Sequence, residues 1–268
     1  EVASLVHIGV REVTLIGQNV NSYRGGTSFA QLLRRVAQVP GIERVRFTTS
    51  HPHDLSSELI DAIGSEPRIA PHFHLPVQSG SDTVLRRMRR DYTVEAYLAK
   101  LQALRAARPG IAVTTDIIVG FPGETDQDFE ATLELTRAVR YENQFSFVFS
   151  PRPHTAAGLR EKEWGIVSQG VKVERLERLQ KVQRRITGEI LAGEVGKRVE
   201  VLVEGPSRSD PRRRFGRTAE NRTVNFDGDA PAGARVLVQV TSSSPNALGG
   251  TQAGLVDLPP ISPAAAAA

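Results

Sequence analysis

The stretch that decides the fold is a strand, a turn and a helix start at residues 112–125, which read AVTTDIIVGFPGET. Apolar and β-branched residues over Ala112–Gly120 predict a buried strand. Glycine and proline interrupt the strand, and Thr125 with Asp128 three residues later forms the capping-box pattern that starts a helix. A strand followed directly by a capped helix is the repeating unit of a parallel α/β fold.

The same unit recurs along the first part of the chain. Further short strands are predicted at Glu12–Gly17, Arg44–Thr49, His72–Leu75 and Gln144–Phe149. Helical patterns lie between the strands, at Phe29–Val39, Ser56–Gly64, Val94–Arg108 and Asp126–Arg140. Such alternation predicts an α/β fold with a parallel sheet and crossover helices, in fewer units than the eight of a closed barrel. Because the chain begins inside an amphipathic stretch without a methionine, we expect a fragment whose missing units precede Glu1.

The second part of the chain changes its pattern. A long amphipathic helix is predicted at Gly170–Leu191, with Val173 and Leu179 in its apolar stripe and Lys172 and Arg175 outside it. From Val195 onward, period-two runs separated by turn residues predict a small antiparallel β-barrel. We therefore expect an α/β domain over residues 1–191, a β-barrel over 192–257 and a disordered tail over 258–268.

The composition indicates an ordinary globular protein and excludes several kinds of site. Of 268 residues, 34 are Lys or Arg and 30 are Asp or Glu, so the net charge is +4. No apolar run is long enough to span a bilayer, and we expect a cytoplasmic protein without a membrane partner. Cysteine is absent, which excludes disulfides, thiolate nucleophiles and cysteine-held iron–sulfur clusters within these residues.

The residues that follow the predicted strands are rich in amides, hydroxyls and glycines. In parallel α/β folds the chemistry lies at the carboxyl ends of the strands. Groups of this kind suit a polar cofactor better than proton transfer, and no catalytic residue stands out. Simpler interpretations remain open: Gly120 and Gly123 build a tight turn, and Ser81 or Asp82 caps a helix.

Histidines and arginines form further patterns. His51 with His53 and His72 with His74 are spaced for a metal site, which with Asp116 would suit a metal-dependent hydrolase, but we expect ordinary polar or core histidines and no bound metal. The arginines near Met88 fit a solvated helix end. Six arginines between Gly205 and Phe226 suit a phosphate backbone, so we expect the barrel to bind RNA, with a solubilising surface as the alternative.

Several segments, in one order along the chain, resemble the tRNA methylthiotransferases of the radical-SAM superfamily. They are residues 12–23, 46–52, 74–82, 115–125, 147–153, 201–207 and 216–226. The last of them lies in a barrel that resembles a TRAM domain. The branch that acts on N6-isopentenyladenosine is the most similar, and branches acting on threonylcarbamoyl adenosine or a ribosomal protein remain alternatives.

The resemblance implies a partial radical-SAM (β/α) barrel and a radical mechanism. In this family a 4Fe–4S cluster on a CxxxCxxC loop cleaves S-adenosyl-L-methionine to a radical. The radical abstracts hydrogen from C2 of an isopentenylated adenosine beside the anticodon. A second 4Fe–4S cluster supplies sulfur and a second S-adenosylmethionine supplies the methyl group. The implied partners are the tRNA anticodon stem-loop and an electron-donor protein.

The resemblance also carries functional residues over to this chain. Those that would hold S-adenosylmethionine are Gly17, Gln18 and Asn19 on its methionine part, Gln78, Ser79 and Asp116 on its ribose or carboxylate, and Gly120 through Glu124 on its adenine side. Arg217, Asn221 and Arg222 would grip tRNA, and His154 stands where many relatives have glycine. Every expected cysteine is missing, because the resemblance begins downstream of the cluster loop. We therefore expect the chain alone to be inactive, and an RNA-binding remnant without catalysis is the main alternative.

Overall fold

The computed structural model describes residues 1–48, 50–208 and 210–256, so the predicted disordered tail lies outside the described residues. All five predicted strands of the first part are present. They are β1 (Glu12–Leu15), β2 (Arg44–Phe47), β3 (His72–His74), β4 (Ala112–Val119) and β5 (Asn143–Val148). Strands β1 and β2 pair in parallel, as do β3, β4 and β5, and a parallel bridge from Val45 to Ile69 connects the two groups.

The four helices that the periodicity predicts between the strands are present as α2 (Phe29–Ala37), α3 (Ser57–Ser65), α5 (Val94–Ala107) and α6 (Asp126–Val139). The structure also has α1 (Val2–His7) before β1, α4 (Asp82–Arg87) after β3, and the 3-10 turns η1 (Val20–Ser22) and η2 (Pro52–Asp54). The capping box at Thr125 is confirmed, since its side chain accepts from the Asp128 backbone while the Asp128 carboxylate accepts from the Thr125 backbone. After β5 come the short α7 (Ala156–Leu159) and α8 (Glu161–Trp164), then the long α9 (Gln169–Ala192).

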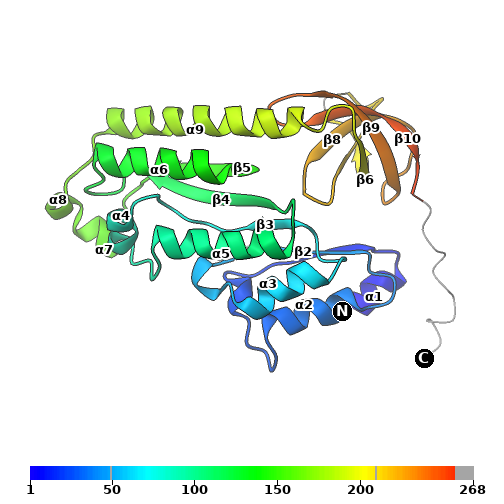
Figure 1. The fold of residues 1–268 in the computed structure, drawn as a ribbon, viewed down its shortest axis with the longest axis horizontal. Coiled ribbons are helices and arrows are strands. Elements are labelled where there is room, and N and C mark those ends of the chain that lie inside the picture. The colour runs from blue at the N-terminus through cyan, green and yellow to red at the C-terminus, as the bar shows by residue number, and fades with distance from the viewer. Residues whose placement is uncertain (49, 209, 257–268) are drawn as a thin grey trace.

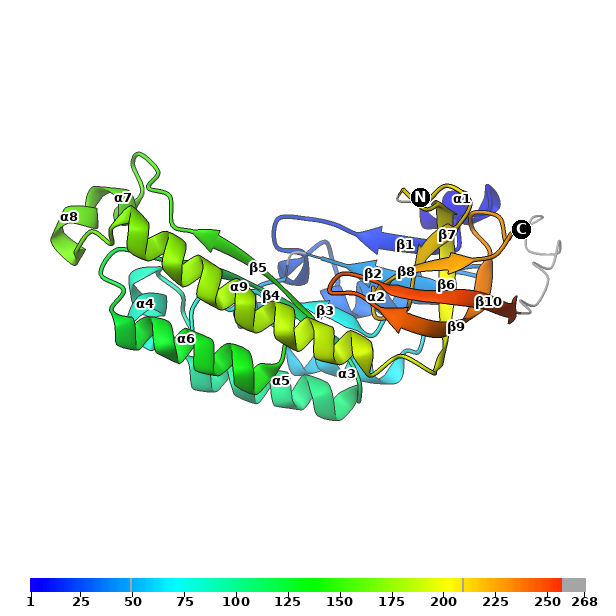
Figure 2. The ribbon, with the colours of Figure 1, turned by 90° about the horizontal axis from the view of Figure 1, so that it is seen from above.

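The helices cover one face of the parallel strands (Figure 2). Val13, Val45, Phe73 and Ile117 point to that side and join the main hydrophobic core. Because strand side chains alternate, their neighbours point to the opposite face, where the helices are absent. We call this the open face; its residues include Glu12, Arg46, His72, His74, Asp116 and Phe145.

The polarity of α9 differs from the prediction. Lys172 and Arg175, expected on the polar side, are buried, whereas Val173, expected in the apolar stripe, is 39% exposed. The reason is an acidic environment that the periodicity cannot show: Arg175 pairs with Glu124, and Lys172 lies 3.8 Å from Glu161. A charged side chain is tolerated inside a protein when such a partner compensates it.

The second part of the chain forms a closed five-stranded barrel. Its strands are β6 (Arg198–Pro206), β7 (Arg214–Arg217), β8 (Thr223–Asp227), β9 (Arg235–Ser243) and β10 (Leu248–Leu255), arranged β10-β8-β7-β6-β9. The predicted barrel is confirmed, but it is not wholly antiparallel, because β10 pairs in parallel with β8. An odd number of strands cannot alternate in direction around a closed ring, so at least one neighbouring pair must be parallel.

The barrel packs against the amino ends of the parallel strands. Figure 1 places it at one end of α9, opposite α7 and α8. Ion pairs join the two parts, from Arg44 to Glu200 at 2.9 Å and from Arg222 to Glu142 at 2.6 Å. The carboxyl ends of the strands therefore remain uncovered by the barrel. Within the described ranges, no helix is both long and apolar enough to cross a membrane.

Candidate functional site

The carboxyl ends of β1 and β2 carry the first group of predicted site residues. Gly17 and Gln18 are exposed directly after β1. Asn19 donates from Nδ2 to Asp54 Oδ2 at 2.7 Å. The neighbouring Asn21 exchanges two hydrogen bonds with the backbone of His51, so the loops after the two strands hold each other in place.

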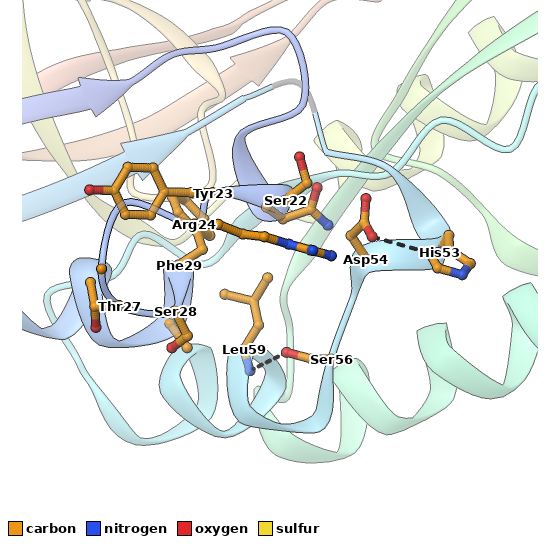
Figure 3. A pocket seen from close by; sticks show the side chains of 13 residues that line it. Ser22, Tyr23, Arg24, Thr27, Ser28, Phe29, His53, Asp54, Ser56 and Leu59 are labelled. Carbon is orange, nitrogen blue, oxygen red and sulfur yellow. Dashed lines mark hydrogen bonds and ion pairs between the residues drawn. The ribbon is translucent and has the colours of Figure 1, made fainter.

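A cavity of about 610 Å³ lies beside these loops, lined by residues 21–30 in part and by His53, Asp54, Ser56 and Leu59. Figure 3 shows Tyr23 on one side of it, Asp54 and His53 on the other, and the Arg24 side chain extending from the Tyr23 side toward Asp54. Two buried polar atoms near this edge, Asn19 Oδ1 and Ser50 Oγ, find no hydrogen-bond partner among the residues described. Unpaired buried polar atoms are rare, and here they suit a bound molecule with N–H or O–H groups.

His51 fastens this edge to the neighbouring α4–α5 loop. Its Nε2 lies 2.8 Å from Arg90 Nη1, and its ring contacts Tyr92 edge-on. Burial and the Arg90 charge lower the pKa of His51 below its ordinary value. A neutral imidazole accepts a hydrogen bond from the Arg90 guanidinium here. His51 therefore has a structural role, and not the role of a metal ligand that its spacing from His53 had suggested.

Gln78 and Ser79 lie where β3 ends. Gln78 adopts a left-handed backbone with φ +71°, donates its N–H to Asp116 and accepts from the N–H of Ile118, which extends the sheet beside β4. Ser79 Oγ is 3.4 Å from Thr132 Oγ1 on α6. Ser81 does cap α4, as the simpler interpretation proposed. The loop thus positions Gln78 next to Asp116, while Ser79 faces a helix.

The turn after β4 is built around Gly120 and Glu124. Gly120 has φ +69° and donates its N–H to Glu124 Oε1 at 2.9 Å. The same carboxylate pairs with Arg175 Nη1 at 2.7 Å and is nearly inaccessible. Burial raises the pKa of Glu124, although the Gly120 N–H and Arg175 both act in the other direction. Glu124 therefore shapes this turn and has its acceptor atoms directed inward.

A second cavity, of about 600 Å³, lies between the open face and the terminal barrel, and we call it the inter-domain cavity. Among its lining residues are His72, His74, Asp116 and Phe145 from the strands. His74 Nε2 is 3.4 Å from Asp116 Oδ2, and His74 Nδ1 is 2.9 Å from Thr114 Oγ1. Burial, together with the nearby Arg46 charge, lowers the pKa of His72 to about 3.

The predicted RNA-binding residues border the same cavity from the other side. Arg217 donates to Glu204 at 3.0 Å and to Asn221 at 3.3 Å, with 43% of its side chain exposed. Asn221 has φ +71°, which asparagine tolerates better than most residues. Arg222 is mostly buried and pairs with Glu142 and Glu194. These three residues are thus brought together, but Arg222 already has partners within the chain.

The structure brings Asp116, Arg217, Asn221 and Arg222 to one cavity and leaves Gly17, Gln18 and Asn19 at the separate edge after β1. Sequence reasoning missed Phe145 and Thr114 as cavity residues. Alternation along β4 and β5 was the available signal, since Thr114 and Asp116 face the same way and lie opposite Asn143 and Phe145.

The residues can be tested against the expected cofactors. The carboxyl edge of the strands, with exposed glycine and amide groups and two unpaired buried oxygens, fits a polar molecule such as S-adenosylmethionine. The iron–sulfur clusters do not fit, because the chain has no cysteine to ligate them. Within the described part of the chain, no three His, Asp or Glu side chains are placed to hold a metal ion.

Comparisons with known proteins agree with the fold. The family model of the Radical SAM superfamily matches residues 1–136, and that of the TRAM domain matches residues 193–251. Among solved structures, coproporphyrinogen III oxidase from Escherichia coli, described as a Radical SAM enzyme, aligns with 95% of this chain and 63% of its own. The TM-score is 0.50 and the identity is 14%, so this is a likeness of fold.

Curated relatives are much more similar in sequence. A tRNA-2-methylthio-N(6)-dimethylallyladenosine synthase of Myxococcus xanthus (strain DK1622) is 69% identical over 98% of this chain and 57% of that protein. The protein of the same name from Anaeromyxobacter sp. (strain K) is 64% identical over 94% of this chain and 56% of its own. The chain therefore spans somewhat more than half the length of these relatives.

The superfamily model covers half of the chain, and the residues that it matches form the strand–helix units of the parallel sheet up to α6. Family match and architecture agree, and the chain belongs to the Radical SAM superfamily.

Proposed function

We propose that this chain forms the cofactor-binding edge and the RNA-binding barrel of a tRNA methylthiotransferase that acts at C2 of N6-isopentenyladenosine next to the anticodon. The observation that carries the proposal is the 69% identity, over 98% of the chain, to a relative named as the dimethylallyladenosine methylthio-synthase. Residues 1–191 would be the radical-SAM part and 192–257 the RNA-binding barrel.

S-adenosylmethionine would lie at the carboxyl ends of the strands. Gly17, Gln18 and Asn19 would hold its methionine part, and the unpaired Oδ1 of Asn19 would accept from its amino group. Gln78 would hold its ribose or carboxylate, and Ser79 would brace the same loop against α6; Asp116, predicted with them, lines the inter-domain cavity. Gly120 would border the adenine, with Glu124 acting through the turn that it stabilises. When bound, one S-adenosylmethionine would supply the radical that abstracts hydrogen from C2, and a second would supply the methyl group.

The two 4Fe–4S clusters would have to be held by cysteines outside this sequence, since none is present here. Their electrons would come from a donor protein in the cytoplasm. It follows that the chain by itself should bind substrate and cofactor without turnover. Iron–sulfur reconstitution of the isolated chain should give no stoichiometric iron and no charge-transfer band, and a stably bound cluster would contradict this.

RNA binding would depend on the exposed part of the terminal barrel. Arg217 is partly accessible and next to Asn221, so it can reach a phosphate or a base edge. Arg222 would act by keeping the barrel next to β5 through its ion pair with Glu142, and so would support the RNA surface.

The test is binding of the chain to an anticodon stem-loop RNA that carries N6-isopentenyladenosine, measured over a range of salt concentrations. Arg217→Ala should weaken binding and reduce the salt slope by about one unit. Arg185→Ala, whose side chain is 83% exposed on α9, is the matched control and should change little. Equal effects of the two substitutions would contradict the proposed RNA surface.

Two alternatives predict different results in the same experiment. The absence of cysteine favours an RNA-binding remnant, which would bind the stem-loop but show no heat of S-adenosylmethionine binding in calorimetry. A sister enzyme would prefer a stem-loop with threonylcarbamoyl adenosine. The proposal requires both a preference for the isopentenylated RNA and measurable S-adenosylmethionine binding.

A further inference from the structure

The inter-domain cavity contains an aromatic side chain that its surroundings do not bury. Phe145 on β5 is 50% exposed, whereas Phe73 and Phe129 in the core are almost inaccessible. Its ring meets His74 edge-on, with 6.1 Å between ring centroids, so one partner orients it while part of its surface faces the cavity. Exposed aromatic rings in a nucleic-acid-binding protein commonly stack on unpaired bases.

The charges inside the cavity disfavour a phosphate and favour a group with N–H donors. Its lining has three carboxylates, Asp116, Glu142 and Glu220, against two guanidinium groups, Arg217 and Arg222. Both guanidinium groups already pair with carboxylates, Arg222 with Glu142 and Arg217 with Glu204. Asp116 lies directly opposite Phe145 across the β4–β5 ladder, which places an acceptor beside the aromatic ring.

The volume and the position agree with the same ligand. About 600 Å³ is within the range of cavities that hold small organic ligands. The cavity also continues to Arg217 and Asn221, the residues of the proposed RNA surface, so a strand bound there could insert one base.

We propose that the inter-domain cavity binds one unstacked nucleobase of RNA with an exocyclic amino group, which stacks on Phe145 and donates to Asp116. Adenine and cytosine carry such a group. The inference rests on the proposed function, because it requires an RNA partner, and it extends that function by naming the base-binding subsite. Phe145 is the contact residue, and His74 positions it.

The test uses the 268-residue chain and a fluorescently labelled RNA hairpin of anticodon stem-loop size. Base stacking is worth about 1–3 kcal/mol, so Phe145→Ala should weaken hairpin binding by about 5-fold to 150-fold. Phe147→Ala is the matched control, because Phe147 is on the same strand and face, is 53% exposed and does not line the cavity. It should change affinity by less than about 2-fold.

Abasic substitutions at successive loop positions then identify the inserted base. At one loop position, occupied by adenine or cytosine, the abasic hairpin should bind the wild-type chain more weakly than the intact hairpin does. The same abasic hairpin should bind wild type and Phe145→Ala with equal affinity. If the affinity lost in Phe145→Ala adds to the affinity lost with the abasic substitution at every loop position, the proposed subsite is wrong. Equal effects of Phe145→Ala and Phe147→Ala would also overturn it. If the wild-type chain does not bind the intact hairpin, both the inference and the proposed RNA function fail; binding that is indifferent to Phe145 rejects the inference alone.

Discussion

Arg46 on β2 donates from Nη2 to the backbone carbonyl of Thr218 in the terminal barrel at 2.8 Å, across 172 residues of sequence. Its Nη1 donates to the carbonyl of Ala219 and its Nε to Glu12, so one buried guanidinium connects the sheet to the turn that precedes Asn221. The position of the proposed RNA-binding residues therefore depends on a side chain in the α/β part.

Arg46→Met should lower the free energy of unfolding by about 1–3 kcal/mol, because it removes the Arg46 donor from the Ala219 carbonyl and one of two donors from the Thr218 carbonyl, which keeps the Asn221 N–H. Urea denaturation measures this. Arg212→Met is the control, since Arg212 is 89% exposed and pairs only with Asp210 among the described residues; it should change stability by no more than about 0.5 kcal/mol. Equal losses of unfolding free energy in Arg46→Met and Arg212→Met would show that the buried Arg46 hydrogen bonds do not stabilise the fold more than a surface ion pair does.

Glu124→Gln should destabilise the fold by about 3 kcal/mol, because it leaves the buried Arg175 without its buried charge partner. Asp126→Asn removes the other carboxylate of Arg175, which is 97% exposed, and should change stability by at most about 1 kcal/mol. Thermal denaturation of both variants gives the comparison. A larger effect at Asp126 would contradict the central place of Glu124.

Gly120→Ala should cost about 1–3 kcal/mol in unfolding free energy. Its φ of +69° disfavours any side chain, and a Cβ would come within 2.4 Å of Lys172 Cγ, which is itself buried. Gly170→Ala, in the first turn of α9 with open space around it, should be neutral or slightly stabilising. Chemical denaturation of the two variants measures both, and a tolerated alanine at residue 120 would refute this account of the turn.

His72 should make stability depend on pH. In the unfolded chain a histidine takes up its proton near pH 6.5, whereas the folded chain holds the pKa of His72 at about 3. Between these values the unfolded state binds more protons, so stability is complete above about pH 6.5 and falls as the pH decreases toward 3.

The measurement is the free energy of unfolding at about pH 7 and about pH 5. His72→Gln should show a smaller decrease than the wild type, while His53→Gln, on the surface, should retain the wild-type decrease. An unchanged pH slope in His72→Gln would mean that His72 is protonated inside the fold.

His154→Gly should stabilise the chain by about 0.5–1 kcal/mol, since His154 has φ +67°, a conformation that glycine adopts without strain. His53→Gly, at a position outside the left-handed region, should instead lose stability because glycine only adds freedom to the unfolded chain. Differential scanning calorimetry can compare the two, and a lower melting temperature for His154→Gly would contradict the backbone explanation.

Local pattern was sufficient for the elements of the fold. The strand at Ala112–Val119, the capping box at Thr125 and the period-two runs of the barrel depend on residues close together in sequence, and the structure confirms them. The carboxyl-end rule also located Gly120 and Glu124 at one turn, because their hydrogen bond spans only four residues.

Contacts between distant segments were decided by the tertiary structure. The burial of Arg175, the bond from Arg46 to Thr218 and the cavity shared by Asp116 and Arg217 each join residues far apart in the chain. Periodicity along one helix predicts which of its sides is apolar. It does not predict which charged residue of another segment will pack against that helix. The sequence by itself therefore determined the strands, the helices and the resemblance to a family, whereas the docking of the barrel and the cavity beside Phe145 exist only once long-range packing has brought their walls together.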